Sequence, residues 1–356
     1  RHEDGQVNGI SHFYEHMVFK GTKNRDPIDI VRSIESKGGY INAYTTRDHT
    51  CFYTRVVKEE LGLATEVLCD MVNEPLLLKE DFHKEKEVIL EEVRAALDNP
   101  EDIIHDIFAE ALWGKEGLGL PIAGYLSTVN KIKLTDLKKY QTSVRNKFHL
   151  VVSASGAVKH QEFVNDVKKA LTRQKSFKYH KTQFQESKSR HLVRQKEVQQ
   201  CNLVIGNSFP THGIRQQVAL NLMNNVFGDG MSSRLFQTIR EEHGLAYTVY
   251  SCVDNYKDTM SFNIGLSLED RKFEAALKLL SQEIQLLKRE GINQAELDQA
   301  KATLKGGLQL SLESTSSRMN YMARQVMRRP NESPYTPAKT LKLIDQIKLS
   351  EVNGLI

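Results

Sequence analysis

Residues 11–19 of the chain read SHFYEHMVF. This stretch places His12 and His16 four residues apart, with Glu15 directly before the second histidine. Residues i and i+4 of an α-helix lie on one face, so a helix here would project both imidazoles together, with Glu15 on the neighbouring part of that face. The apolar residues 17–19 indicate that this helix is partly buried.

These residue types suit a metal site. Two neutral imidazoles can bind one zinc ion, which lowers the pKa of a bound water to about 7, and a nearby carboxylate can take the water's proton. The pattern H-x-x-E-H is the inverted form of H-E-x-x-H and is typical of the inverzincins. The competing interpretation is two histidines that share a face by chance. Burying Glu15 beside them without a metal would cost roughly 1–3 kcal/mol for each unpaired polar group, which favours the metal.

A catalytic zinc ion takes three protein ligands and a water molecule, so one ligand must come from elsewhere. The helical pattern of residues 80–97 (EDFHKEKEVILEEVRAAL) is rich in acids. Spacing alone leaves several candidates open: Glu80, Glu85, Glu87, Glu91 and Glu92.

Length and composition limit the number of domains and the classes of partner that we expect. At roughly 100–200 residues per domain, 356 residues predict two domains. The net charge of +4 is small and interspersed, which argues against a nucleic-acid partner, and no apolar run approaches the roughly 18–20 residues of a membrane span. The four cysteines form no C-x-x-C pair, which favours a reducing compartment over a disulfide scaffold. The chain begins RHEDGQVNGI without an initiator Met, which leaves open whether a segment precedes it.

The chain reads as two weak copies of one α+β unit. In each half a helix, a Gly loop, a second helix, a Gly stop, a β-rich pair and a third helix follow in this order, with the β-rich pairs at 40–45 and 51–57 and at 246–253 and 260–267. Such a pattern predicts antiparallel sheets packed with helices and related by internal duplication. A late strand is expected at 149–156. We expect a catalytic domain at 1–175, a polar linker at 176–192 and a homologous non-catalytic domain at 193–356.

Four motifs carry a resemblance to a known family. They are HFYEHMVFKGT (residues 12–22), GGYINAYTTRDHT (38–50), EKEVILEEV (85–93) and GMSSRLFQTIREEHGLAYTVYS (230–251). In this order they resemble the pitrilysin/insulinase zinc metallopeptidases, and especially the short branch with the mitochondrial processing peptidase subunits and bacterial processing-peptidase-like proteins. The resemblance covers nearly the whole chain and implies a two-domain α+β peptidase.

The resemblance also implies roles in the metal site. The family's spacing between the second histidine and the distal ligand selects Glu92, so the ligands would be His12, His16 and Glu92. Glu15 would be the catalytic base. Glu85, two helical turns before Glu92, would support the site by orienting a zinc-binding histidine. The alternative for Glu85 is an ordinary solvated helix acid.

Substrate contacts are implied in both halves. Asn42 and Ala43 match a strand that binds an extended peptide through main-chain hydrogen bonds, a role compatible with an ordinary hairpin strand. Arg240 and Tyr247 match a pair that would reach substrate near the zinc, with Tyr247 donating to the developing oxyanion and Arg240 fixing the substrate backbone. Without the resemblance they read as a surface helix residue and a strand residue. Asp48 departs from the family's usual Glu.

The second copy cannot bind zinc. Aligning its first helix with residues 11–19 places apolar or amide side chains opposite the three histidine and glutamate positions, namely Leu220, Met223 and Asn224. One zinc ion per chain is therefore expected.

These features together predict a zinc-dependent endopeptidase that cleaves unfolded peptides or presequences. The resemblance implies that a two-domain chain pairs to enclose a chamber, so we expect a homodimer, with a heterodimer as the alternative. No membrane partner is expected. Arg240 and Tyr247 would then serve the partner's zinc site. The acids of 85–102 would favour basic peptides. The bacterial cytoplasm is the expected compartment, with the mitochondrial matrix as the alternative. Two rivals are a non-catalytic peptide-binding or structural member of the fold and a zinc hydrolase of small molecules.

Overall fold

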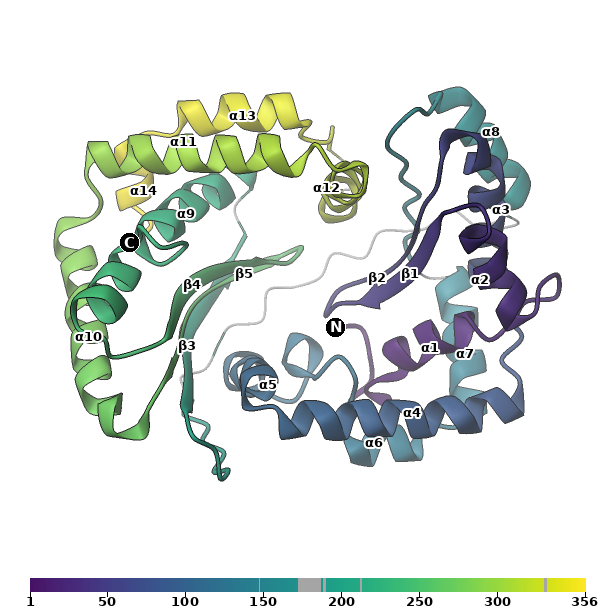
Figure 1. The fold of residues 1–356 in the computed structure, drawn as a ribbon, viewed down its shortest axis with the longest axis horizontal. Helices are drawn as coiled ribbons and strands as arrows, with labels where there is room; N and C mark the ends of the chain where they lie inside the picture. Colours follow the sequence, from purple (N-terminus) through teal and green to yellow (C-terminus); the bar gives the residue numbers. More distant parts are fainter. Residues whose placement is uncertain (147, 172–186, 188–189, 212, 330–331) are drawn as a thin grey trace. The chain divides into compact units, whose positions relative to one another are not determined.

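The computed structural model describes residues 1–146, 148–171, 187, 190–211, 213–329 and 332–356 (Figure 1). The chain forms two compact units, one of Arg1–Asn99 with Trp113–Lys181 (unit 1) and one of Pro100–Leu112 with Thr182–Ile356 (unit 2). The sequence-based division did not foresee that Pro100–Leu112 groups with the second unit. Most of the predicted linker 176–192 lies outside the described residues.

The described residues of unit 1 form a hairpin and a set of helices. Its elements are η1 (Gly5–Val7), α1 (Ile10–Val18), α2 (Pro27–Glu35), β1 (Tyr40–Thr45), β2 (Thr50–Arg55), η2 (Lys58–Glu60), α3 (Leu61–Asn73), α4 (Lys79–Asp98), η3 (Gly117–Gly119), α6 (Leu126–Lys131), α7 (Leu134–Asn146) and α8 (His160–Ala170). Local sequence explains the limits of α2: Asp26 accepts a hydrogen bond from the amide of Asp29, Pro27 begins the helix, and Gly38 adopts a φ of 72° after its end.

The core of unit 1 gathers around α1. This helix buries Phe13, Met17 and Val18 completely. Phe13 stacks on Phe82 of α4 with ring centroids 5.1 Å apart, and Ile89 of α4 is also fully buried. Figure 1 shows α1 next to α4 and α7. Since the apolar face of α1 is fixed in this core, its other face is held in a defined orientation.

Unit 2 contains a three-stranded antiparallel sheet in the order β3-β5-β4. Its elements are α5 (Pro100–Trp113, whose last residue groups with unit 1), β3 (Cys201–Pro210), α9 (Ile214–Phe227), η4 (Phe236–Glu242), β4 (Thr248–Asn255), β5 (Thr259–Leu268), η5 (Asp270–Lys272), α10 (Phe273–Glu290), α11 (Gln294–Ser311), α12 (Thr315–Arg328), α13 (Pro337–Gln346) and α14 (Leu349–Asn353).

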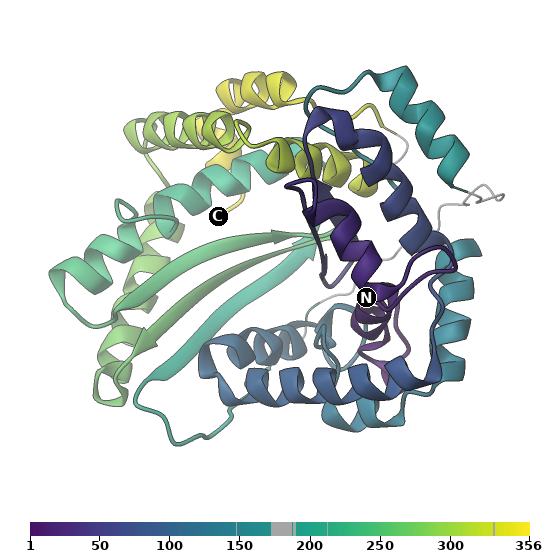
Figure 2. The same ribbon diagram turned by 45° about the vertical axis from the view of Figure 1, so that its right-hand side comes forward.

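The central strand β5 is buried on both faces. Alternate residues Met260, Ile264 and Leu266 join the apolar core with residues of α9, α10 and α11. The residues between them include Ser261 and Asn263, also buried, so the other face is polar. Figure 2 shows the helices of the core on one side of the sheet and α5 beside the other.

The predicted α+β class with two duplicated units is confirmed. Unit 1 runs α1, α2, β1, β2, α3, α4, and unit 2 runs α9, η4, β4, β5, α10, α11. The strand predicted at 149–156 is wrong, because no described strand pairs with this segment. The sequence analysis missed β3, although the run LVI at 203–205 is typical of a strand. Within the described residues, each helix is too short or too polar to span a bilayer.

Candidate metal centre

Three predicted ligands meet on one side of α1. His12 and His16 lie one turn apart on this helix, half-buried, with ring centroids 4.7 Å apart. Glu92 comes from α4, whose buried residues Phe82 and Ile89 pack in the same core as α1. The Oε2 atom of Glu92 lies 3.7 Å from Nε2 of His12 and 3.6 Å from Nε2 of His16. Two helices fixed by one core therefore bring the three side chains together.

The geometry of this donor set fits zinc. One ligand atom from each of His12, His16 and Glu92 lies within 4.8 Å of the others. Tetrahedral zinc with bonds of 2.0–2.2 Å separates its ligand atoms by about 3.4 Å. The observed separations of 3.6 and 3.7 Å are close to this value but too long for hydrogen bonds. The three donors thus surround a common point rather than bonding to one another.

The protonation state of His12 also suits a metal ligand. Burial, and secondly the neighbouring His16, lower the pKa of His12 to about 4. The imidazole of His12 is therefore neutral at pH 7, and a neutral imidazole is the form that binds a metal.

The second nitrogen of His16 has a fixed partner. Its Nδ1 lies 3.1 Å from Oε2 of the buried Glu85, and Oε1 of Glu85 lies 2.6 Å from Nζ of Lys20. A proton on Nδ1 donates to Glu85 and leaves the Nε2 lone pair directed toward Glu92. By contrast, Nδ1 of His12 is buried and has no hydrogen-bond partner in the described part of the chain.

Glu15 lies between the two histidines in sequence and accepts a hydrogen bond from Thr45 Oγ1 at the end of β1. Burial raises the pKa of Glu15, and this effect is opposed by the hydrogen bond from Thr45 and by the charge of His16. A carboxylate with a raised pKa beside a metal site is well suited to accept a proton and to release it again.

The start of α1 is fixed by contacts that sequence reasoning missed. Oε2 of Glu3 accepts a hydrogen bond from the amide of Gly9, and Oε1 accepts one from the amide of Ser11, both at 2.8 Å. A carboxylate here caps the helix and complements its dipole. Gly9 and Gly124 pass so closely that a Cβ on Gly9 would meet the carbonyl oxygen of Ala123 at 2.6 Å. No pattern within residues 1–19 reveals the contact with Gly124, because 115 residues separate the two glycines.

The predicted substrate strand lies at a sheet edge. Asn42 and Ala43 belong to β1, which pairs with β2 as Asn42↔Tyr53 and Ala43↔Phe52. Among the described residues β1 has no strand on its other side. The amide of Ala43 donates to Oδ1 of its neighbour Asn42 at 2.8 Å. An open edge of this kind can accept an extended peptide.

The predicted pair Arg240 and Tyr247 belongs to unit 2, where the two side chains contact each other. The guanidinium carbon of Arg240 lies 4.8 Å from the ring centroid of Tyr247 and 4.7 Å from that of Phe236. Tyr247 is 73% exposed. Arg240 lies in η4, a stretch of π-helix, and such stretches are frequent at functional sites.

The second copy of the motif has no ligand set. Leu220 and Met223 of α9 are buried in the core of unit 2. Asn224 is also buried and accepts a hydrogen bond from Ser251 Oγ at 2.8 Å.

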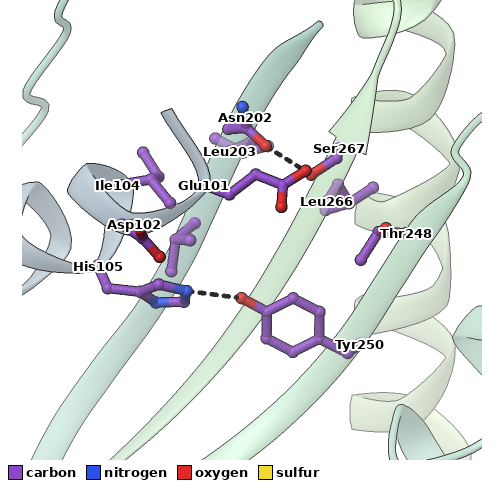
Figure 3. Close-up of a pocket in the computed structure, with 11 residues that line it drawn as sticks. Glu101, Asp102, Ile104, His105, Asn202, Leu203, Thr248, Tyr250, Leu266 and Ser267 are labelled. Carbon is purple, nitrogen blue, oxygen red and sulfur yellow. Dashed lines mark hydrogen bonds between the residues drawn. The ribbon is translucent and has the colours of Figure 1, made fainter. Parts of the chain in front are cut away.

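Unit 2 has a pocket of about 270 Å³ between α5 and the polar face of its sheet (Figure 3). Glu101, Asp102 and His105 extend from α5 toward the strands in this view. Nε2 of His105 lies 3.4 Å from the hydroxyl of Tyr250 on β4. Two carboxyl groups, those of Glu101 and Asp102, therefore line this pocket.

Family models match both halves of the chain. A model described as Insulinase (Peptidase family M16) matches residues 1–125, and one described as Peptidase M16 inactive domain matches residues 131–304. The uncharacterized zinc protease YmxG of Bacillus subtilis (strain 168) is 35% identical over 363 residues, covering 100% of this chain and 86% of the relative. An uncharacterized zinc protease of Streptomyces coelicolor is 33% identical over 329 residues, covering 90% of this chain and 72% of the relative.

Solved structures share the fold. A protease from Helicobacter pylori matches with a TM-score of 0.88 at 22% identity, covering 99% of this chain and 87% of the other. A peptidase M16 inactive domain from Pseudomonas fluorescens matches with a TM-score of 0.82 at 18% identity, covering 99% and 86%. The family models and the 35% identity along the full chain show the family that the sequence motifs predicted: the chain belongs to peptidase family M16, the pitrilysin and insulinase family of metallopeptidases.

Proposed function

We propose that this chain is a zinc-dependent endopeptidase that binds one zinc ion through His12, His16 and Glu92. The observation that carries the proposal is the convergence of these three donors, with separations of 3.6 and 3.7 Å between each histidine Nε2 and the Glu92 carboxylate. The naming of the bacterial relatives as zinc proteases supports it. Glu85 is proposed to orient His16 by accepting a hydrogen bond from its Nδ1, 3.1 Å away.

Glu15 is proposed as the general base. Zinc, when bound, supplies a Lewis acid and lowers the pKa of a water molecule to about 7. Glu15 then takes a proton from the attacking water on a carboxylate oxygen and delivers it to the leaving amide nitrogen. The raised pKa of Glu15, caused first by burial, supports this role because it makes the carboxylate a better proton acceptor than an exposed one.

The substrate is proposed to bind as an extended chain. Its backbone would pair with the open edge of β1 at Asn42 and Ala43, which selects an unfolded peptide over a folded protein. Tyr247 would donate its hydroxyl proton to the developing oxyanion, and Arg240 would bind a substrate carbonyl. The high exposure of Tyr247 supports its availability for a partner molecule.

Basic peptides, including presequences, are the proposed substrate class. Glu101 and Asp102 both line the pocket of unit 2 beside Tyr250. Carboxylates and an aromatic ring are the groups that bind a guanidinium or ammonium side chain. The branch of the processing peptidases, which the sequence motifs resemble, suggests the same class.

A homodimer that encloses a chamber is the proposed assembly, with a heterodimer as the alternative. In this arrangement Arg240 and Tyr247 of one protomer would serve the zinc site of its partner. The absence of a second ligand set at Leu220, Met223 and Asn224 supports one active site per chain. Sedimentation of the active protein as a monomer in the ultracentrifuge would rule this assembly out. The bacterial relatives support a bacterial source. The cytoplasm is the proposed compartment, and fractionation of the source cells tests it.

Replacement of the base tests the proposal. Glu15→Gln is expected to keep its zinc and to lose on the order of 10²- to 10⁴-fold in cleavage of a quenched fluorescent peptide. Glu91→Gln is the matched control, because Glu91 is an exposed acid next to a proposed ligand. Wild-type turnover by Glu15→Gln would refute the mechanism. Zinc binding by the wild type without cleavage of any peptide would favour the rival, a non-catalytic peptide-binding member of the fold.

A further inference from the structure

The last residue of strand β1 in the hairpin of unit 1 lies beside Glu15. Alternate residues of a strand share a face, so Ile41, Ala43 and Thr45 lie on one side of β1. Ile41 is buried in the core that includes α1. The same face therefore brings the Thr45 hydroxyl to α1, where it donates to Oε2 of Glu15.

Thr45 Oγ1 also contacts a second hydroxyl, and the bond to Glu15 decides the direction of that contact. Oγ1 of Thr45 lies 3.1 Å from Oγ1 of Thr50, its register partner on β2. A hydroxyl has one proton to donate, and that of Thr45 is committed to Glu15, so Thr50 is the donor in the second contact. In the part of the chain that the structure describes, Oε1 of Glu15 accepts no hydrogen bond. Oε1 is thus the oxygen left for a proton from water.

The turn of the hairpin is held in place on both sides. The amide of Thr46 donates to the carbonyl of His49 at 2.8 Å and closes the turn. The guanidinium of Arg47 donates to the carbonyls of Leu118, at 3.1 Å, and of Leu120. Since both contacts lie next to Thr45, its hydroxyl is presented from a fixed backbone rather than from a mobile loop.

We propose that Thr45 is a positioning residue for the base: it holds Oε2 of Glu15 so that Oε1 takes the proton of the attacking water. In this step the O–H bond of water breaks, its oxygen bonds to the scissile carbonyl carbon and an Oε1–H bond forms; the proton then moves to the amide nitrogen as the C–N bond breaks. Oε2 remains an acceptor throughout, so Thr45 keeps its hydrogen bond. The inference rests on the proposed function, and it links the base to the strand that carries Asn42 and Ala43.

The test compares Thr45→Val, Thr45→Ser and Thr54→Val by peptide cleavage. Thr45→Val removes the hydroxyl at constant shape and is expected to lower kcat on the order of 10- to 100-fold, with KM and zinc content near wild type. Thr45→Ser, which restores the hydroxyl, recovers most of the lost kcat. Thr54→Val is the control, because the Thr54 hydroxyl in the same hairpin donates to the Tyr40 carbonyl instead of to Glu15. Wild-type kcat in Thr45→Val, while Glu15→Gln is inactive, would overturn the inference and leave the proposed function standing.

A second readout does not depend on activity. In the metal-free protein, Thr45→Val is expected to lower the melting temperature by roughly 2 °C. In a Glu15→Ala background, Thr45→Val should lower the melting temperature by at most half as much, because the hydrogen bond to Oε2 of Glu15 is already absent. Equal decreases in both backgrounds would show that Thr45 does not act on Glu15, whether or not the wild type cleaves peptides.

Discussion

Glu85 holds His16 by its Nδ1 atom, with 3.1 Å between Nδ1 and Oε2 of the buried carboxylate. The contact leaves Nε2 of His16 facing Glu92. Orientation of a ligand by its hydrogen-bond partner typically affects metal affinity as well as geometry.

We therefore expect Glu85→Gln to weaken zinc binding by about 10- to 100-fold, because the amide is a poorer acceptor for the His16 proton. A competition titration with a chromophoric chelator measures this change. Glu87→Gln is the control, since Glu87 is an exposed acid on the same helix. Equal zinc affinities for the two variants would show that Glu85 does not support the site.

Removal of the pocket's charge should affect basic substrates selectively. In a Glu101→Gln/Asp102→Asn variant we expect KM for an arginine-containing peptide to rise on the order of tenfold, with KM for a matched neutral peptide unchanged, since only the charged side chain loses its partners. Steady-state kinetics on the peptide pair measures the ratio. If the double variant changes KM equally for the two peptides, the pocket does not select basic side chains.

Truncation of Phe13 should destabilise the core that holds α1. Its ring is fully buried and stacks on Phe82 with an angle of 5° between the planes. Phe13→Ala is expected to lower the free energy of unfolding by about 3–5 kcal/mol, as measured by urea denaturation. Val57→Ala, at a position 55% exposed, should change it by less than about 0.5 kcal/mol. A loss below about 1 kcal/mol at Phe13 would contradict the described core.

Acid should remove one stabilising ion pair of unit 2. Arg215 donates to both carboxylate oxygens of Glu351 at 2.5 and 2.8 Å, and these bonds, with the Lys348 amide, lower the pKa of Glu351 from 4.5 to about 2. A lowered pKa in the folded state means that the pair stabilises above about pH 4.5 and that this stabilisation disappears as the pH falls toward 2. Arg215→Met should therefore lower the melting temperature more at pH 7 than at pH 3. The same decrease at both pH values would refute this linkage.

Much of the site could be predicted from local spacing. The i and i+4 histidines on an apolar-backed helix require only the periodicity of residues 10–18, and the structure has α1 over that range. The choice of Glu92 among five acids required the family resemblance, because helical spacing does not say which face of α4 meets α1. In the structure that face is set by Phe82 and Ile89, which pack in the core of α1.

The remaining contacts depend on tertiary packing. Thr45 lies 30 residues from Glu15, and Lys20 and Glu85 are 65 residues apart, so no local pattern indicates either pair. The grouping of Pro100–Leu112 with unit 2 has the same origin. The segment 149–156 has a strand-like composition but no described partner, and a strand requires a partner for its hydrogen bonds.

The zinc content of the purified protein shows whether the three donors hold a metal ion. We expect one zinc ion per chain for the wild type and for His83→Ala, a change at an exposed histidine of α4. His16→Ala should fall to a small fraction of this value under the same dialysis. Full zinc retention by His16→Ala, or no zinc in the wild type after loading, would contradict a metal centre built from His12, His16 and Glu92.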